Sequence, residues 1–507
     1  MILHFAATAI AAVLFALVYE PFHAGAVSFL ALTPIVLVFT SPSVPCSPLK
    51  ALFFGFSFGL CAAMAIVGPW MYSAAADYFE QGMAWSLAFT LAVNAVYVAL
   101  FQAGAFLALR LLSGAPPLAR VFGAASMWTV FEMLRAADPA GNRWALLGQG
   151  ASSLPLIREA ATFGGEIFVG WMAALCGAAI GVGLQRDLNS RNAVRCMVIG
   201  VAVPLSLAFL GGVERLRDPD IGPLPPLRVA VVQAEIASRD VWDPAQRVAH
   251  WNAYVEATAA LPAKSIDLVV WPESAVPFLL DSDPSAKARL HELANSLGAA
   301  ILLGAPRSAG TGEGRAAVFN SAYFFAPGSD EVKTYDKRRL LPFVERSAGE
   351  NEGEGADYQA GTSVALFDVK GWRIAPLLCF EALYPEYARE AVLGGAHLLV
   401  NLSNDAWFSG GAGPEQHASM SRMRAIELRR PMVRAANGGI SGAIAPDGED
   451  ISFPIRRAKA VGIYEIPSPP RRLTLAATHP GVVPVAASAI AALVLLLSLR
   501  ALFVPKD

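Results

Sequence analysis

With 507 residues, the chain is longer than one ordinary domain. Hydrophobic residues make up 55% of it and charged residues only 16%, whereas soluble globular proteins carry about 25% charged residues. The net charge of −2 and the lack of any basic run exclude an electrostatic binder of nucleic acid. Because residues 1–212 are almost uncharged while 213–472 are normally charged, the composition predicts a membrane part and a polar domain.

Apolar stretches nearly free of charge recur along the first part and return at the end of the chain. Several approach the roughly 20 residues that cross a bilayer, so we expect about eight spans. The first is not a typical signal peptide, because the only basic side chain before it is His4 and because further spans follow. The stretches cover residues 5–19, 25–40, 51–68, 85–109, 118–134, 163–184, 196–212 and 482–504.

The basic residues of the short loops predict the orientation of these spans. If the N-terminus is cytoplasmic, the opposite short loops hold only Arg135, Arg143 and Arg158. This asymmetry places both termini in the cytoplasm and the polar domain on the other side of the membrane. The cytoplasmic connections and tail then hold Lys50, Arg110, Arg120, Arg186, Arg191, Arg195, Arg500 and Lys506.

Strands and helices alternate in the polar domain, which a proline-rich linker over 213–226 introduces and a second one from 467 closes. Uninterrupted apolar strands between helices indicate sheets buried on both faces. The predicted strands are 228–235, 267–271, 299–305, 317–325, 373–379 and 397–401, and the predicted helices are 244–261, 284–298, 385–393 and 415–430.

Cys379 is the only cysteine of the polar domain, so this domain cannot form an internal disulfide. It follows the apolar run 374–378, and the carboxyl ends of buried strands are where open α/β sheets place reactive groups. A free cysteine is more often a small buried hydrophobe, which is the alternative. No C-x-x-C or H-E-x-x-H spacing occurs, so we expect neither a metal nor a cofactor.

Two further residues could act with this thiol. Glu273 ends the strand 267–271 behind Trp271-Pro272, where burial could raise its pKa toward that of a general base. Lys337 follows Tyr335-Asp336 and could hold a thiolate and an oxyanion, with help from the backbone N–H of Phe380. The ordinary alternatives are an exposed loop carboxylate and a solvated basic cluster.

Glu273, Lys337 and Cys379, in this order and mostly at strand ends, resemble the catalytic set of the nitrilase superfamily. The flanking segments 337–345, 401–408, 413–427 and 434–440 resemble apolipoprotein N-acyltransferases. The resemblance implies a membrane α-helical bundle over 1–212, an α/β nitrilase-like αββα sandwich over 227–466, and a linker with a C-terminal transmembrane helix over 467–507.

The resemblance also implies roles for individual residues. Glu273 would be the general base, Lys337 the electrostatic stabiliser and Cys379 the nucleophile. Trp407 and Phe408 would be lid or membrane-facing aromatics, with ordinary loop packing as the alternative. The residues that would support the site are Trp242, Asn320, Glu345, Phe380 and Glu381.

The sequence departs from the family pattern at three places. Phe380 stands where the family usually has tyrosine, and Asn437-Gly438-Gly439 stands for Asn-Asn-Gly. The usually apolar segment after the lysine is an acidic, glycine-containing loop over 346–361. With Phe380, any role of the tyrosine hydroxyl is missing, and we expect the acidic loop to bear on how lipid enters the site.

The activity implied by the resemblance is the last step of lipoprotein maturation. An acyl chain would move from a phospholipid, expected to be phosphatidylethanolamine, through a thioacyl-cysteine enzyme to the α-amino group of the N-terminal diacylglyceryl-cysteine of an apolipoprotein. The enzyme would be a multi-pass monomer of the bacterial inner membrane with a periplasmic catalytic domain.

Three alternatives are weaker. A membrane-anchored amidohydrolase of the nitrilase type would need only one span. A Cys-His thiol hydrolase using His417 leaves Glu273 and Lys337 unexplained. A transporter would need more intramembrane charges than Glu132 and its few neighbours.

Overall fold

The computed structural model describes residues 1–78, 80–137, 141–217, 222–237, 240–309, 317–342, 344–345, 358–408 and 410–503. Most of the predicted acidic loop 346–361, and residues 218–221 of the predicted linker, lie outside these ranges. The chain divides into two compact units. Unit 1 holds Met1–Asp218, Gly410–Gln416 and Thr474–Asp507, and unit 2 holds Pro219–Ser409 and His417–Leu473.

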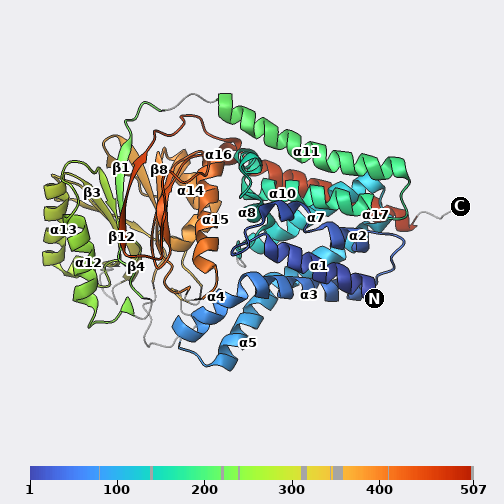
Figure 1. Ribbon diagram of the computed structural model, residues 1–507, viewed down its shortest axis with the longest axis horizontal. Helices are drawn as coiled ribbons and strands as arrows, with labels where there is room; N and C mark the ends of the chain where they lie inside the picture. The colour runs from blue at the N-terminus through green and yellow to red at the C-terminus, as the bar shows by residue number, and fades with distance from the viewer. Residues whose placement is uncertain are drawn as a thin grey trace. The chain divides into compact units, whose positions relative to one another are not determined.

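Unit 1 is helical, as predicted (Figure 1). Within the described residues, five helices are long and apolar enough to cross a membrane: Pro48–Ile66, Met83–Gly114, Ala161–Gly183, Ser190–Arg215 and Val482–Arg500. Its helices are α1 (Ile2–Leu17), α2 (Thr33–Phe39), α3 (Pro48–Ile66), α4 (Gly68–Ser73), α5 (Met83–Asn94), α6 (Leu100–Leu111), α7 (Pro117–Ala136), α8 (Leu147–Ala151), α9 (Pro155–Arg158), α10 (Ala161–Gly183), α11 (Ser190–Arg217), α16 (Leu475–Thr478) and α17 (Val482–Phe503).

The expected count of about eight spans is not confirmed, and local chemistry explains why. The stretch 25–40 is broken into a 3₁₀ helix, Gly25–Phe29, and the short helix α2, because Pro34 fits only the first turn of a helix. Helix α1 has only 16 residues. Helix α7 carries Arg120, Glu132 and Arg135, all buried.

Buried polar groups of unit 1 hold the loop that follows α7. The Arg135 guanidinium donates to the carbonyls of Trp144 and Ala145 at 2.8 and 3.0 Å. The Glu132 carboxylate accepts from the backbone N–H of Leu147 at 2.8 Å. Gln416 adds a contact, since its Oε1 accepts from the indole of Trp144 at 2.7 Å. These charges therefore have structural partners of their own.

Unit 2 is built from two six-stranded sheets, which confirms the predicted αββα sandwich. Helices α12 (Arg247–Ala259) and α13 (Pro284–Leu297) lie outside the first sheet, and α14 (Pro385–Leu393) and α15 (Gly413–Leu428) lie outside the second (Figure 1). The strand order of the first sheet is β12 (Ala460–Ile466), β1 (Leu227–Gln233), β2 (Leu268–Val270), β3 (Ala300–Ala309), β4 (Ala317–Phe325) and β5 (Val332–Asp336). The strand order of the second sheet is β11 (Ile455–Arg456), β10 (Ile440–Ile444), β9 (Met432–Asn437), β8 (Leu398–Asn404), β7 (Trp372–Leu378) and β6 (Phe367–Val369).

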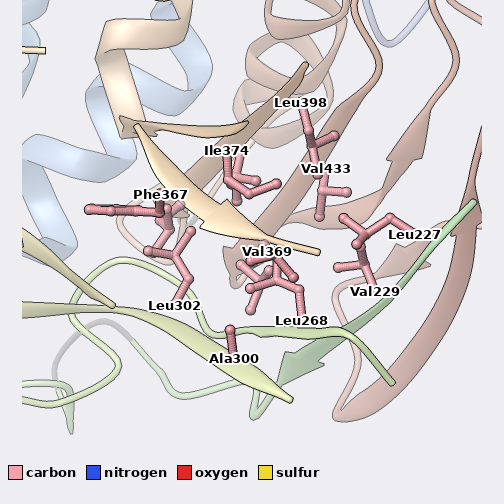
Figure 2. Packing of buried hydrophobic residues seen from close by; sticks show 14 of the residues in the cluster. Leu227, Val229, Leu268, Ala300, Leu302, Phe367, Val369, Ile374, Leu398 and Val433 are labelled. Carbon is pink, nitrogen blue, oxygen red and sulfur yellow. The ribbon is translucent and has the colours of Figure 1, made fainter. Parts of the chain in front are cut away.

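The main core of unit 2 lies between the two sheets. Figure 2 shows Val229 and Leu268 of the first sheet facing Ile374 and Val433 of the second. The alternate residues of the first sheet, such as Ala230, pack under α12 and α13 instead. Because both faces of the strands are covered, their sequences are apolar without interruption.

Candidate active site

Cys379 lies directly after β7, where the chain turns from a strand into a short 3₁₀ helix, Cys379–Leu383. Its backbone has φ +47°, a left-handed conformation that costs a non-glycine residue about 1 kcal/mol or more. The amide of Asn401, on the neighbouring strand β8, donates to the carbonyls of Leu377 and Cys379 at 3.1 and 3.2 Å. The predicted strand 373–379 therefore ends one residue early, and the nucleophile candidate occupies a fixed turn.

Lys337 follows β5 and is almost completely buried, with 2% of its surface exposed. Its ammonium donates to Glu273 Oε1 and to Glu345 Oε1, each at 2.9 Å. The Asn320 amide donates to the same two oxygens at 2.8 and 2.6 Å. The structure thus brings together four of the residues that the sequence singled out. Since one cation and one amide lie between two carboxylates, the arrangement holds both acids close to each other.

The charged groups of this cluster affect the pKa of the Cys379 thiol. Burial raises the pKa of the Cys379 thiol, the Glu273 carboxylate raises it further, and the Lys337 ammonium acts against both. Burial by itself lowers the pKa of Lys337, but the carboxylates of Glu273 and Glu345 outweigh it and hold that pKa well above its usual value. The resting site therefore contains a neutral thiol and a charged lysine.

Glu381 joins the turn after Lys337 to the strand β7, which ends directly before Cys379. Its carboxylate is completely buried and accepts from the N–H of Arg338 at 2.6 Å and of Leu378 at 2.7 Å. The Tyr335 hydroxyl donates to it as well, at 2.9 Å. Burial raises the pKa of Glu381, and these N–H donors act against that rise. Glu381 therefore supports the geometry of both the lysine and the thiol.

Close backbone packing places Glu273 after β2. A Cβ atom on Gly304 of β3 would lie 2.6 Å from the Cα of Glu273, so only glycine allows this approach. Ser274, the next residue, has φ +56°. The second carboxylate oxygen of Glu273 accepts from the N–H of Asn404 at 3.0 Å, which links the acid to the end of β8.

The other residues named from the sequence lie at varied places. Phe380 is half-buried, with its ring edge-to-face to Tyr384 at 5.2 Å. Trp242 is 43% exposed and lines a cavity of about 760 Å³ that Trp251 also lines. Trp407 stacks on Phe408 at 3.9 Å, and Phe408 is buried. Their roles stay predictions.

A buried polar cluster that sequence reasoning did not assign lies on the same strand ends. Cys379 Sγ, a carboxylate oxygen of Asp405 and a ring nitrogen of His417 all lie within 4.8 Å of one another. Among the described residues this group has the donors for a metal ion, but the Arg434 guanidinium contacts the Asp405 carboxylate at 2.5 Å. A cation there would meet a fixed positive charge, so the arrangement does not favour one.

This cluster could not be found by local patterns. Cys379 follows β7 and Asp405 follows β8, whereas His417 lies on α15 and Arg434 on β9, and no spacing in the sequence connects them. The only signal is that Asp405, His417 and Arg434 lie in the segments of family resemblance 401–408, 413–427 and 434–440, and the resemblance gives them no role. His417 is otherwise only the base of the Cys-His alternative.

Comparisons with known proteins agree with the two units. Residues 228–473 match the family model of carbon-nitrogen hydrolases, and residues 11–179 match that of the apolipoprotein N-acyltransferase N-terminal domain. A CN-hydrolase superfamily protein from Xanthomonas campestris has a solved structure that is 24% identical and covers 48% of this chain and 90% of its own, with a TM-score of 0.36.

Curated relatives extend the match into both units. The apolipoprotein N-acyltransferase of Geobacter metallireducens is 35% identical, over 64% of this chain and 63% of its own length. That of Azotobacter vinelandii is 32% identical, over 79% of this chain and 78% of its own length. Together with the apolar helices, these relatives indicate a membrane protein. The chain belongs to the apolipoprotein N-acyltransferase family.

Proposed function

We propose that this protein N-acylates the α-amino group of the diacylglyceryl-cysteine at the N-terminus of apolipoproteins, with a phospholipid as acyl donor. The observation that carries the proposal is the buried Lys337, held between Glu273 and Glu345 at 2.9 Å each and close enough to influence the pKa of Cys379. A lone thiol with a paired acid and a fixed cation can form and release an acyl-enzyme.

The first half-reaction forms a thioester. Glu273 takes the proton of Cys379 while Sγ attacks the ester carbonyl of the phospholipid, and Lys337 stabilises the resulting oxyanion. Since burial raises the pKa of Cys379, proton removal accompanies the attack rather than preceding it. The C–O bond then breaks, and protonated Glu273 returns its proton to the departing lysophospholipid.

The second half-reaction transfers the acyl group to nitrogen. The lipoprotein amine attacks the thioester carbonyl, Glu273 accepts a proton from the amine, and the C–S bond breaks as the amide forms. The leaving thiolate recovers its proton from Glu273. The two half-reactions predict ping-pong kinetics, and transfer prevails over hydrolysis only where water is scarce.

The cellular setting is part of the same proposal. The enzyme is a monomer of the bacterial inner membrane, its donor is phosphatidylethanolamine, and its catalytic domain over 227–466 lies in the periplasm. The bundle over 1–212 and the segment 467–507 anchor it, with both termini in the cytoplasm.

The test uses the purified full-length protein in liposomes and a phospholipid with a labelled acyl chain. Intact mass is read before and after a diacylglyceryl-cysteine peptide is added. We expect a labelled adduct on Cys379 that moves to the peptide amine, no adduct for Cys379→Ala, and a normal adduct for Cys61→Ala, which removes an exposed cysteine. Release only as free fatty acid would identify a hydrolase of the carbon-nitrogen type instead.

A further inference from the structure

Ser403 lies beside Cys379 on the neighbouring strand. β7 and β8 run parallel, and their register pairs Leu378 with Leu402, the residues directly before Cys379 and Ser403. Leu402 belongs to the core between the sheets, so the alternation of a strand directs Ser403 to the opposite face. Ser403 is completely buried there.

The Ser403 hydroxyl lies between Asp405 and Cys379. It donates to Asp405 Oδ1 at 2.7 Å, and a carboxylate oxygen of Asp405 lies within 4.8 Å of Cys379 Sγ. The Ser403 hydroxyl also acts to lower the pKa of the Cys379 thiol. A hydroxyl has one hydrogen and two lone pairs. While its hydrogen is directed to Asp405, it can only accept the S–H of a neutral thiol. If a thiolate forms, that acceptor contact has no hydrogen, and the serine hydrogen can turn to sulfur only by leaving Asp405.

Asp405 can release this hydrogen because other donors hold it. The Arg434 guanidinium contacts its Oδ2 at 2.5 Å, and His417 Nδ1 lies 2.9 Å from its Oδ1. Burial favours the protonated acid, but Arg434 and His417 outweigh it and hold the pKa of Asp405 well below its usual value. The carboxylate therefore stays charged and bonded without the serine.

We propose that Ser403 is a further catalytic residue of this site, whose hydroxyl turns from Asp405 to Cys379 Sγ as the thiol loses its proton and stabilises the negative charge that develops on sulfur. The thiol proton goes to Glu273, and Ser403 keeps its own hydrogen throughout. When the C–S bond forms and the charge on sulfur disappears, the hydroxyl returns to Asp405. The inference rests on the proposed function in that Cys379 is the nucleophile.

The test compares three variants of the full-length protein in detergent. Ser403→Ala removes the hydroxyl and Ser403→Thr keeps it. Ser441→Ala is the matched control, because Ser441 is an equally buried serine of the same sheet whose hydroxyl donates to Gln233. The S–H stretching band of Cys379 is read as the infrared difference from the Cys379→Ala variant. Alkylation of Cys379 by iodoacetamide is followed by peptide-level mass spectrometry at pH 7–9.

We expect the S–H band of Ser403→Ala to move to higher frequency and its alkylation to slow about tenfold, since a donor to a charged group is lost. Ser403→Thr should restore both, and Ser441→Ala should match the wild type. An unchanged band, or a shifted band with wild-type alkylation, would overturn the proposal. Neither readout needs an acyl donor, so a wild type that forms no thioester would refute the proposed function separately.

Discussion

The substitution Glu381→Gln tests how the site is held together. A glutamine has one acceptor oxygen, whereas the Glu381 carboxylate receives the N–H groups of Arg338 and Leu378 on different oxygens. If the amide oxygen keeps Arg338, the amide nitrogen faces the N–H of Leu378. One buried backbone donor is then left without an acceptor, which costs about 1–3 kcal/mol. The remaining bonds lose the strength that a charged acceptor gives them, by about 1 kcal/mol.

Relief of charge burial offsets part of this cost, so we expect a net loss of about 2 kcal/mol. For a unit of this size, that loss lowers the melting temperature by roughly 4–8 °C. Thioester formation should slow about tenfold or more, because the lost contact lies next to Cys379. Thermal unfolding in detergent and single-turnover mass spectrometry measure the two effects.

The matched control is Glu390→Gln. Glu390 is bonded to the same Arg338, but through the side chain and at the surface, with its own side chain 54% exposed. Exposed ion pairs contribute about 1 kcal/mol or less, so this variant should behave as wild type. The reasoning is refuted if Glu381→Gln has the same melting temperature as Glu390→Gln and forms the thioester at the wild-type rate.

Three more predictions concern the same cluster. Lys337→Met should cut thioester formation about a hundredfold or more in the single-turnover assay, because Glu273 and Glu345 then face each other without a cation. Asn320→Asp replaces an amide donor by a third carboxylate. Its rate of thioester formation should therefore rise again as the pH is lowered and the added acid becomes protonated, whereas the rate of Asn320→Ala should not. Since burial raises the pKa of Cys379, iodoacetamide should alkylate it more slowly in the folded protein than in the SDS-unfolded chain, with the rate still rising at pH 9.

The elements that follow strong local patterns were predictable. The strand 317–325 and the helix 385–393 have the predicted bounds, because apolar runs and Pro385 mark them clearly. Strands β5, β6 and β9 to β12 were not predicted. β5 is a short, partly exposed strand, and it exists because it pairs with β4 over Ser321–Phe325. Such pairing over a distance leaves no periodic signal of its own.

The proximity of Glu273, Asn320, Lys337 and Glu345 agrees with the set named from the sequence, although their roles await experiment. What the sequence could not supply was the pairing of donors with acceptors. That Glu381 receives the N–H of Leu378, for example, depends on the turn at Cys379. Hydrogen bonds between elements far apart in the chain are set by packing, which a single sequence does not display.

Because the backbone of Cys379 is left-handed, the residue that would make the protein most stable to heat at this position is not the residue that can react. In most positions glycine makes a protein less stable than alanine does, because the unfolded chain gains freedom. At φ +47° the order reverses, since alanine keeps the steric conflict of a Cβ atom and glycine does not. Cys379→Gly should therefore withstand heat better than Cys379→Ala, and neither can form a thioester. A selection for thermal endurance alone would drive this position away from the only side chain that reacts.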